Sequence, residues 1–274
     1  MCAYQGDNPA DFQLALESIL NQSTQADEII LVVDGPVGAP LHHIIKQYQD
    51  TENERLTAIF LPENAGLTRA LNHGLKHCNH PLVVRMDADD IAHRDRIKHQ
   101  LGFMQAHPEV ALLGTQMTEF TGSPKNLLPS KTLPLCHGEI VRKLPWRNPI
   151  NHPTVCFRRD IVVKLGGYPE LKFLEDYFLW SKLIARGYRC QNLPLSLLFY
   201  RFDDQTLLRR SGAKNFTNEI RLRWWLRNHD LCSTPTFLVA SLMQLILRFA
   251  PISLRRYLWR RARSTALSGS NEQP

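Results

Sequence analysis

The sequence lacks the cysteine arrangements that mark zinc-binding or disulfide-rich domains. Its 274 residues include six cysteines, which are widely scattered, with no Cys-x-x-Cys pair and no histidine at zinc-finger spacing. This scatter is typical of a reduced, cytoplasmic chain. We therefore expect neither a zinc finger nor a disulfide framework. The cysteines are Cys2, Cys78, Cys136, Cys156, Cys190 and Cys232.

Long apolar runs are missing as well. Residues Met1–Asp7 show neither a basic start nor an apolar run, so we expect no secretory signal there. The most apolar stretch, Phe237–Ile252, is short and is interrupted by Gln244, Arg248 and Pro251. A membrane-spanning helix needs about 20 mainly apolar residues, so the sequence predicts no span.

Positive charge is concentrated near the C-terminus. The net charge is +7, yet the first two thirds of the chain are close to neutral and arginines dominate from Arg209 onward. Ser253–Arg263 mixes arginines with leucines and aromatics, which is typical of a helix lying on anionic lipids. We expect residues 231–274 to attach to the inner face of the cell membrane, and we expect no nucleic-acid partner. The alternative is a C-terminal helix packed on the protein with its arginines in water.

Apolar, β-branched runs alternate with amphipathic helical patterns up to about Met117. This alternation predicts an α/β fold with a mainly parallel sheet. Because the runs are apolar throughout, both faces of the sheet should be covered. The predicted strands are Glu28–Val33, Leu56–Leu61, Pro81–Met86 and Val110–Met117. Helical stripes are formed by Phe12, Leu16, Ile19 and Leu20, by Leu41, Ile44, Ile45 and Tyr48, by Leu67, Ala70, Leu71 and Leu75, and by Ile97, Leu101 and Met104.

The chain from about Thr118 to Pro153 is rich in Pro, Gly, Ser and Asn. It predicts a long loop or sheet-crossing segment with a short helix near Glu139–Leu144. Segments of this kind often carry substrate contacts. Regular structure is expected again as a strand at Thr154–Arg158, a turn at Gly166–Tyr168, a helix at Asp176–Ala185 and a strand at Leu197–Phe202.

Carboxylates stand at or near the ends of predicted elements, where open α/β sheets bind ligands. Asp34 follows the strand 28–33 and could accept hydrogen bonds from a base or ribose. Taken alone, an ordinary Asp-Gly turn at Asp34–Gly35 explains it more simply. Glu175 and Asp176 open the helix predicted at 176–185, where acids also complement the helix dipole without any catalytic role.

Asp87, Asp89 and Asp90 follow the strand 81–86 within four residues. Carboxylates this close repel one another unless a cation lies between them, and hard divalent ions prefer oxygen ligands. The alternative is an acidic turn in which Asp90 caps the next helix, an interaction that contributes about 1 kcal/mol. One aspartate suffices for a cap, so this alternative leaves two of the three unexplained.

These acids belong to an ordered set of motifs. The set resembles the inverting family 2 glycosyltransferases of GT-A fold, particularly the bacterial enzymes of exopolysaccharide (amylovoran-type) and O-antigen synthesis, over roughly residues 1–230. The motifs are Ala15–Ser23 (ALESILNQS), Val33–Gly35 (VDG), Asn64–Gly74 (NAGLTRALNHG), Met86–Asp90 (MDADD) with Arg94, Asn151–Val155 (NHPTV), Gly166–Tyr168 (GGY) and Leu174–Trp180 (LEDYFLW).

The resemblance implies a nucleotide-diphosphate sugar as donor and a divalent metal, manganese or magnesium, as cofactor. By it, Asp89 binds the metal that bridges the diphosphate, and Asp87 contacts the ribose or the metal. Asp176 is then the general base, with Glu175 positioning Asp176 or the acceptor. A leaving diphosphate builds negative charge that a cation neutralises, and the acceptor hydroxyl must lose a proton. The residues assigned to nucleotide-sugar binding are Ala3, Tyr4, Asp34, Asn64, Gly66, Arg69, Asp87, Ala88, Arg209 and Arg210.

Several of these residues have structural alternatives. Gly66 could serve an unusual backbone angle as readily as a nucleotide site at a helix N-terminus. Arg209 and Arg210 could form a solvated basic turn instead of donating to the diphosphate. His152, beside Pro153, could shape the acceptor side of the cleft or be purely structural.

The sequence departs from the family in two respects. Where the family begins with a full apolar strand, only Met1–Tyr4 precede the polar turn. The Gln-x-x-Arg-Trp motif of processive synthases is missing, as are long transmembrane segments, so we expect transfer of one sugar. The basic, lipid-binding pattern near the C-terminus indicates a lipid-linked glycan acceptor. The expected domains are a catalytic domain over 1–230, with a nucleotide-binding half (1–117) and an acceptor half (118–230), and an amphipathic basic tail over 231–274.

Other functions fit the sequence less well. A haloacid dehalogenase-type phosphatase carries Asp-x-Asp near its start, followed by Thr or Val, whereas here Asp90 follows the motif. A sugar nucleotidyltransferase needs an N-terminal Gly-rich loop with an arginine, and this sequence has no such loop. A non-enzyme alternative is a non-catalytic, membrane-attached scaffold that keeps the GT-A fold. Sugar transfer or donor hydrolysis with added manganese would distinguish a glycosyltransferase from such a scaffold.

Overall fold

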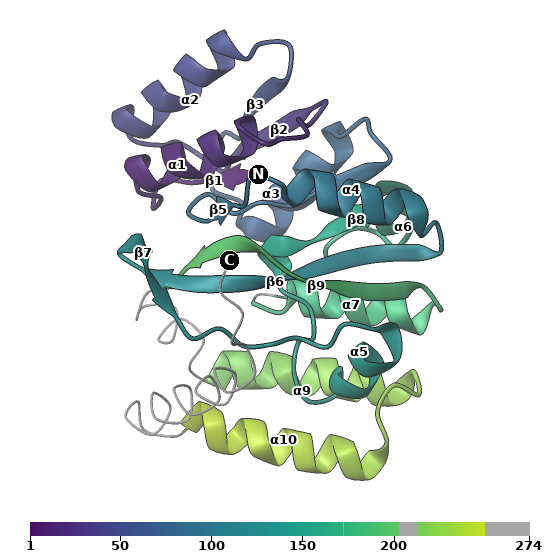
Figure 1. Cartoon of the computed structure of the whole chain (residues 1–274). Coiled ribbons are helices and arrows are strands. Elements are labelled where there is room, and N and C mark those ends of the chain that lie inside the picture. Colours follow the sequence, from purple (N-terminus) through teal and green to yellow (C-terminus); the bar gives the residue numbers. More distant parts are fainter. Residues whose placement is uncertain (172, 203–212, 250–274) are drawn as a thin grey trace.

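The computed structural model describes residues 1–171, 173–202 and 213–249. Two sheets lie next to each other with helices packed around them (Figure 1). The first sheet is parallel, in the order β1-β2-β3, and its strands are β1 (Cys2–Ala3), β2 (Ile29–Val33) and β3 (Leu56–Phe60). The helices of this part are α1 (Pro9–Leu20), α2 (Ala39–Thr51) and α3 (Leu67–His77).

The strand β2 is covered on both faces, as its apolar sequence predicts. Successive side chains of a strand point to opposite faces. Leu31 packs in the cluster with α1 and α2, whereas Val32 packs against Ala70 of α3. The same expectation is wrong for β3, where Thr57 and Phe60 are exposed. β3 has a neighbour on one side only in this sheet, so part of it faces solvent.

The second sheet has the order β4-β8-β6-β9-β5, and β7 pairs with β6. In this second sheet the prediction of a mainly parallel sheet is wrong, because of its described strand pairs β6 and β9 alone run parallel and the others are antiparallel. An apolar run indicates burial on both faces but not the direction of its neighbours. The strands are β4 (Leu82–Val84), β5 (Ile91–Ala92), β6 (Val110–Thr121), β7 (Ser123–Leu128), β8 (Cys156–Arg158) and β9 (Arg189–Arg201).

A β-hairpin replaces the first part of the predicted long loop. Strand β6 continues to Thr121, turns at Gly122 with a φ of 66° and returns as β7. A glycine tolerates this left-handed backbone without steric cost. The hairpin was missed because Ser123–Leu128 is mainly exposed and lacks an alternating apolar pattern. The short helix expected in the loop is confirmed as α5 (His137–Lys143).

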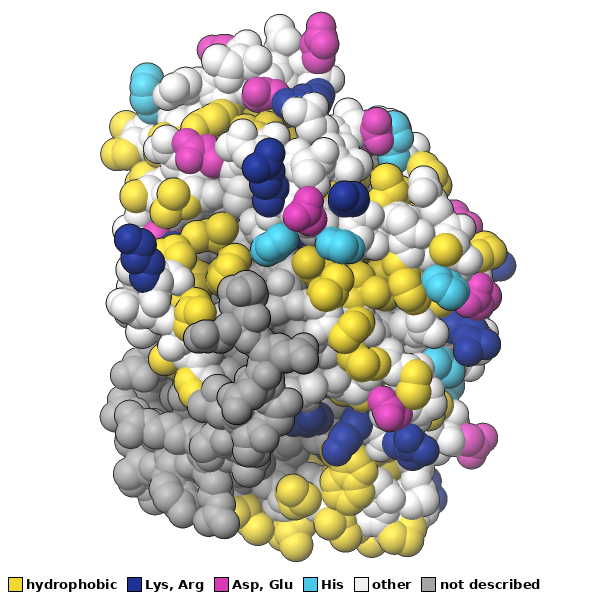
Figure 2. All heavy atoms as spheres, viewed as in Figure 1, with side chains coloured by type: hydrophobic (Ala, Val, Ile, Leu, Met, Phe, Trp, Pro, Cys, Tyr) yellow, Lys and Arg dark blue, Asp and Glu magenta, His cyan; other side chains and the backbone are white. Residues whose placement is uncertain are grey.

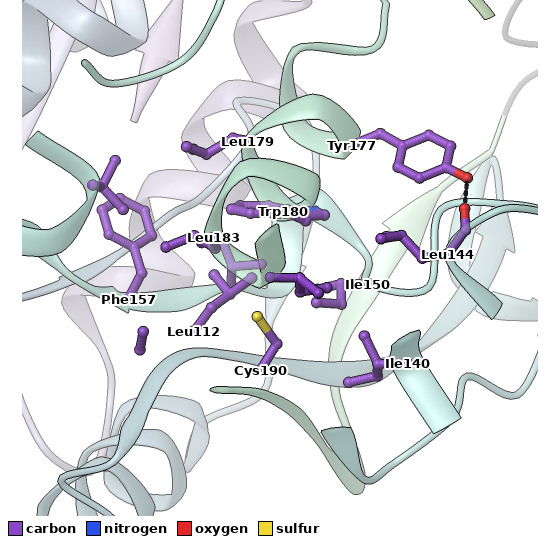
Figure 3. Packing of buried hydrophobic residues seen from close by; sticks show 14 of the residues in the cluster. Leu112, Ile140, Leu144, Ile150, Phe157, Tyr177, Leu179, Trp180, Leu183 and Cys190 are labelled. Atoms are coloured by element: carbon purple, nitrogen blue, oxygen red, sulfur yellow. Dashed lines mark hydrogen bonds between the residues drawn. The ribbon is translucent and has the colours of Figure 1, made fainter. Parts of the chain in front are cut away.

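The helix α7 (Glu175–Ala185) lies in the main hydrophobic core (Figure 3). Trp180 is fully buried, and the core cluster joins it to Leu112 of β6, Phe157 of β8 and Cys190 of β9. The hydroxyl of Tyr177 donates a hydrogen bond to the carbonyl oxygen of Leu144. Close packing on several sides fixes a side chain and its helix in place, so the N-terminal end of α7 is rigidly held.

Two long helices complete the described chain. In α9 (Ala213–Asn228), Leu222 and Leu226 belong to the main core, and α10 (Thr234–Phe249) packs against α9. Among the described residues, no helix is both long and apolar enough to cross a membrane. The segment 253–263, which we expect to lie on lipid, is outside the described residues. The remaining helices are α4 (Arg96–Ala106), η1 (His152–Thr154) and α6 (Arg159–Lys164).

Candidate functional site

Three aspartates gather in the loop between β4 and β5. Carboxylate oxygens of Asp87, Asp89 and Asp90 all lie within 4.8 Å of one another. Asp87 is half-buried, Asp89 is exposed and Asp90 is fully buried. Several carboxylate oxygens converging on one point form the ligand type that Mg²⁺ and Mn²⁺ prefer. The donor set therefore fits the expected divalent metal.

Asp90 supports this loop from inside the protein. One of its oxygens, Oδ1, accepts a hydrogen bond from the amide of Arg201 at 2.9 Å, while Oδ2 is buried and has no hydrogen-bond partner among the described residues. Burial, together with the charges of Asp87 and Asp89, raises the pKa of Asp90 well above its ordinary value. The alternative that Asp90 caps the next helix is wrong, because α4 begins at Arg96.

A fourth acid, Asp7, lies within electrostatic range of this group, and sequence reasoning missed it. Burial and the nearby charges of Asp89 and Asp87 raise the pKa of Asp7 to about 7, although the amide of Tyr4 donates to its Oδ2 at 2.8 Å. Loss of hydration, and then the charge of Asp87, raise the pKa of Asp89 to about 6 even though its side chain reaches solvent. Burial is the largest cause of the raised pKa of both carboxyl groups, and the charges of the neighbouring aspartates add to it.

Two arginines neutralise part of this charge. Arg85, which is 5% exposed, donates through both terminal nitrogens to the two carboxylate oxygens of Asp87. Arg201 donates from Nε to the backbone oxygen of Asp89 at 3.0 Å and forms an ion pair with Asp11 at 2.8 Å. Arg201 was not predicted, since no motif marks it. The predicted Arg209 and Arg210 lie outside the described residues.

The loop 64–66 is bound to Asp34, at the end of β2. The two carboxylate oxygens of Asp34 accept hydrogen bonds from the amides of Ala65 (2.7 Å) and Gly66 (2.9 Å). The side-chain amide of Asn64 donates to the backbone oxygen of Asp34 at 3.2 Å. Gly66 has a φ of 89°, a left-handed backbone conformation that glycine adopts without steric cost. The unusual backbone angle is therefore sufficient to explain a glycine at this position. The loop 64–66 is therefore fixed against the end of β2.

The other described residues that the resemblance assigns to donor binding differ in their exposure. The backbone oxygen of Ala3 accepts from the amide of Asp34 at 2.7 Å, and Tyr4 is 42% exposed. Ala88 is buried in the cluster that contains Ala3. Arg69, on α3, is largely exposed and forms an ion pair with Glu170 at 3.0 Å. Ala3 and Ala88 therefore supply backbone and packing, while Tyr4 and Arg69 remain open to solvent.

Glu175 and Asp176 stand at the N-terminal end of α7. Asp176 is half-buried, and its Oδ2 accepts a hydrogen bond from Asn148 Nδ2 at 2.7 Å. The carbonyl oxygen of the Asn148 side chain accepts from the amide of Ile150 at 3.3 Å, which orients the side chain. Burial, and then the charge of Asp176, raise the pKa of Glu175 to about 7. Asn148 was not predicted, because it contacts Asp176 only through the fold.

An aromatic group packs beside this helix. His152 Nε2 lies 3.2 Å from the hydroxyl of Tyr168, and the rings of both residues pack near Trp180. Burial, and then the charge of Arg85, lower the pKa of His152 well below its ordinary value, so the ring is neutral. Asn72 of α3 exchanges two hydrogen bonds of 2.8 Å with the backbone of Tyr168. The helix α3 is thus tied to the turn 166–168.

Comparison with known proteins supports the motifs. Residues 1–166 match the family model described as Glycosyl transferase family 2. The chain is 34% identical over 264 residues to the amylovoran biosynthesis glycosyltransferase AmsE of Erwinia amylovora, covering 95% of this chain and 96% of that protein. It is 32% identical over 261 residues to the UDP-Gal:alpha-D-GlcNAc-diphosphoundecaprenol beta-1,3-galactosyltransferase of Escherichia coli, covering 95% and 94%.

The fold is shared with solved transferases. The mannosyltransferase PcManGT of Pyrobaculum calidifontis, solved in complex with GDP-Man and Mn²⁺, superimposes with a TM-score of 0.64 at 19% identity and covers 97% of this chain and 73% of that chain. This likeness confirms the α/β fold of the GT-A type that the motifs implied.

Proposed function

The chain belongs to glycosyl transferase family 2, and from this membership we propose that it is an inverting, metal-dependent enzyme that transfers one sugar in the synthesis of a cell-surface polysaccharide. The donor is a nucleotide-diphosphate sugar, and the acceptor is a lipid-linked glycan. The observation that carries the proposal is the placement of two acid groups: Asp87, Asp89 and Asp90 on one loop and Asp176 at the head of α7.

The donor side would work through its carboxylates. Asp89 and Asp87 would hold the cation, which supplies positive charge against the departing diphosphate. Asp34 fixes the loop 64–66 through two backbone amides, so this loop presents a fixed edge to the nucleotide. A preorganised edge needs little rearrangement when the ligand binds, which favours affinity.

The acceptor side would work through Asp176. Its carboxylate accepts the proton of the acceptor hydroxyl, while that oxygen attacks the anomeric carbon opposite the leaving diphosphate and so inverts the configuration. The side-chain amide of Asn148 holds one oxygen of Asp176 in place. Glu175, buried beside it, would position Asp176 or the acceptor.

The identity of donor and acceptor can be tested directly. The galactosyltransferase from Escherichia coli is named for UDP-Gal and for a diphosphoundecaprenol acceptor, which supports trying this pair first. We expect Mn²⁺-dependent release of nucleotide from one member of a UDP- and GDP-sugar panel when a sugar-diphosphate-lipid acceptor is present. If neither transfer nor donor hydrolysis occurs with any donor, the non-catalytic scaffold is the better description.

Membrane attachment is the second part of the proposal. The helix α10 exposes a row of large apolar side chains, each 40–60% exposed, and hydrophobic side chains gather over α10 at the lower edge of Figure 2. The chain that follows is rich in arginine, which suits anionic headgroups. A patch of this kind commonly marks an interaction site. The exposed residues are Leu238, Val239, Leu242, Met243, Leu245 and Ile246.

Vesicle flotation tests this attachment. We expect the full-length protein to float with phosphatidylglycerol-containing vesicles, and the double variant Leu242→Ser, Ile246→Ser to float much less. Leu14→Ser is the matched control, because Leu14 is 45% exposed on α1, far from α10 in the chain. Equal flotation of the double variant and the wild type would contradict a role for α10.

A further inference from the structure

Arg85 is a buried cation fixed next to the acidic loop. Its backbone amide donates to the oxygen of Val155 at 2.9 Å, and its backbone oxygen accepts from Nη2 of the buried Arg96 at 2.7 Å. Its side chain makes the two-point contact with Asp87 described above. The paired planar groups match each other's geometry, which makes such contacts strong and directional. Arg85 is therefore held in one position from the backbone to the guanidinium.

The grip of Arg85 changes what the loop offers to a cation. Both oxygens of Asp87 are engaged by the guanidinium, and Asp90 is fully buried with one oxygen bound to the amide of Arg201. Asp89 is the one carboxylate of the three that is exposed. In this conformation the carboxylate of Asp87, which could ligate a metal, is already paired with Arg85. The buried Oδ2 of Asp90 has no hydrogen-bond partner in the described chain.

We propose that Arg85 is a positioning residue that occupies Asp87 and makes binding of the divalent cation depend on the nucleotide diphosphate. A free cation approaching the loop meets the positive charge of Arg85, whereas a cation bound to a diphosphate brings its own negative charge and oxygen ligands. The inference rests on the proposed function in taking this loop as the metal site.

The charge of Arg85 also reaches the acceptor side. It acts on Glu175 and on His152 as well as on Asp87, Asp89 and Asp90. One buried cation thus lies within electrostatic range of both acid groups. Because interactions between charges weaken steeply in water but persist where solvent is excluded, a buried position is where a single arginine can affect both sides.

The test measures Mn²⁺ binding without turnover. Mn²⁺ is titrated into the full-length protein by electron paramagnetic resonance, alone and with UDP or GDP. We expect the wild type to bind Mn²⁺ weakly alone and about tenfold more tightly or better with the nucleotide that it prefers. Arg85→Met should bind Mn²⁺ alone about tenfold more tightly than the wild type, because a repelling charge is gone and Asp87 is released.

Two further variants keep the test decisive. Arg85→Lys retains the charge, so its binding of Mn²⁺ alone should stay within about twofold of the wild type. Arg158→Met removes an arginine that donates to backbone oxygens of Val110, Met104 and His107, and should leave Mn²⁺ binding unchanged. Unchanged or weaker Mn²⁺ binding by folded Arg85→Met overturns the proposal, as does tightening by Arg85→Lys equal to that by Arg85→Met.

The outcome is separable from that of the proposed function. If the wild type binds Mn²⁺ with the expected dependence on nucleotide but transfers no sugar from any donor, the function fails and the role of Arg85 stands. If sugar is transferred but the nucleotide does not strengthen Mn²⁺ binding, the role of Arg85 fails and the function stands.

Discussion

The two acid groups of the site are stabilised in opposite ways. Asp87, Asp89 and Asp90 lie on a loop and repel one another, with Asp89 open to solvent. Glu175 and Asp176 begin a helix whose other residues, above all Trp180, are packed in the core. In the proposed function the first group needs a cation to balance its charge, whereas packing in the core positions the second. We therefore expect the donor side to respond to metal and the acceptor side to respond to changes in packing.

The largest effect is expected at the exposed carboxylate. Asp89→Asn removes a proposed metal ligand, so Mn²⁺-dependent turnover should fall by about 1,000-fold or more, the size of several kcal/mol of lost charge stabilisation. Turnover across a Mn²⁺ titration is the measurement. Asp95→Asn is the control, because Asp95 is hydrogen-bonded to Ser23 outside the cluster. Full activity of Asp89→Asn would remove Asp89 from the metal site.

The next effect separates the two groups most cleanly. Asp176→Asn should reduce transfer by roughly 100- to 10,000-fold, the usual contribution of a general base, while the affinity for the donor stays the same. Isothermal titration with donor and Mn²⁺ measures the affinity, and nucleotide release measures transfer. Loss of donor binding together with transfer would place Asp176 on the donor side instead.

A smaller effect is expected from the residue that orients the base. Asn148→Ala removes the hydrogen bond to Asp176, and kcat should fall about 10- to 100-fold through misplacement, with KM for the donor unchanged. Asn79→Ala is the matched control, since Asn79 is an exposed asparagine bonded to Glu28. An increase in KM with kcat unchanged would contradict a positioning role.

The smallest effect is on stability. Burial raises the pKa of Asp7 and of Glu175 to about 7 and that of Asp89 to about 6. The metal-free folded protein therefore binds protons that the unfolded chain has already released, and stability should fall as pH rises through 6 to 7. We expect Tm to be about 2–4 °C higher at pH 5.5 than at pH 8.

Adding Mn²⁺ with a nucleoside diphosphate at pH 8 should recover the part of the lost stability that comes from Asp7 and Asp89, because the cation compensates their charge. The part of the loss that comes from Glu175 should remain, and in Glu175→Gln this part of the pH dependence should be absent. Thermal melts of the two proteins, with and without Mn²⁺ and nucleotide, measure both parts. A Tm that is independent of pH in the metal-free protein would contradict the raised pKa values.

Much of the fold followed from periodicity. The stripe of Phe12, Leu16 and Ile19 became α1, and the apolar run at 28–33 became β2, because each pattern matches one element. The hairpin β6–β7 did not follow, since its exposed second strand carries polar residues without alternation. The direction of β8 beside β4 and β6 is also not encoded in its short apolar run.

The residues of the candidate site also divide into those that the sequence predicts and those that it does not. The motif Asp87–Asp90 was visible because three acids in four residues need an explanation. Asp7, Arg201 and Asn148 were not visible, since each is a single polar residue in ordinary local sequence. Asp7 and Arg201 reach the acidic loop from distant positions in the chain, and Asn148 reaches Asp176 from a segment 28 residues away.

The sequence by itself determined the family, the helices α1 to α4, the strands β2, β3 and β4, and the acids on which the chemistry is proposed to depend. Those features are local, because spacing and residue type within a short window are enough to specify them. The tertiary structure alone decided that Arg201 supports Asp89 and Asp90 and that Asn148 orients Asp176. Charge and hydrogen bonding depend on distance in space, and folding brings together residues that the chain keeps apart.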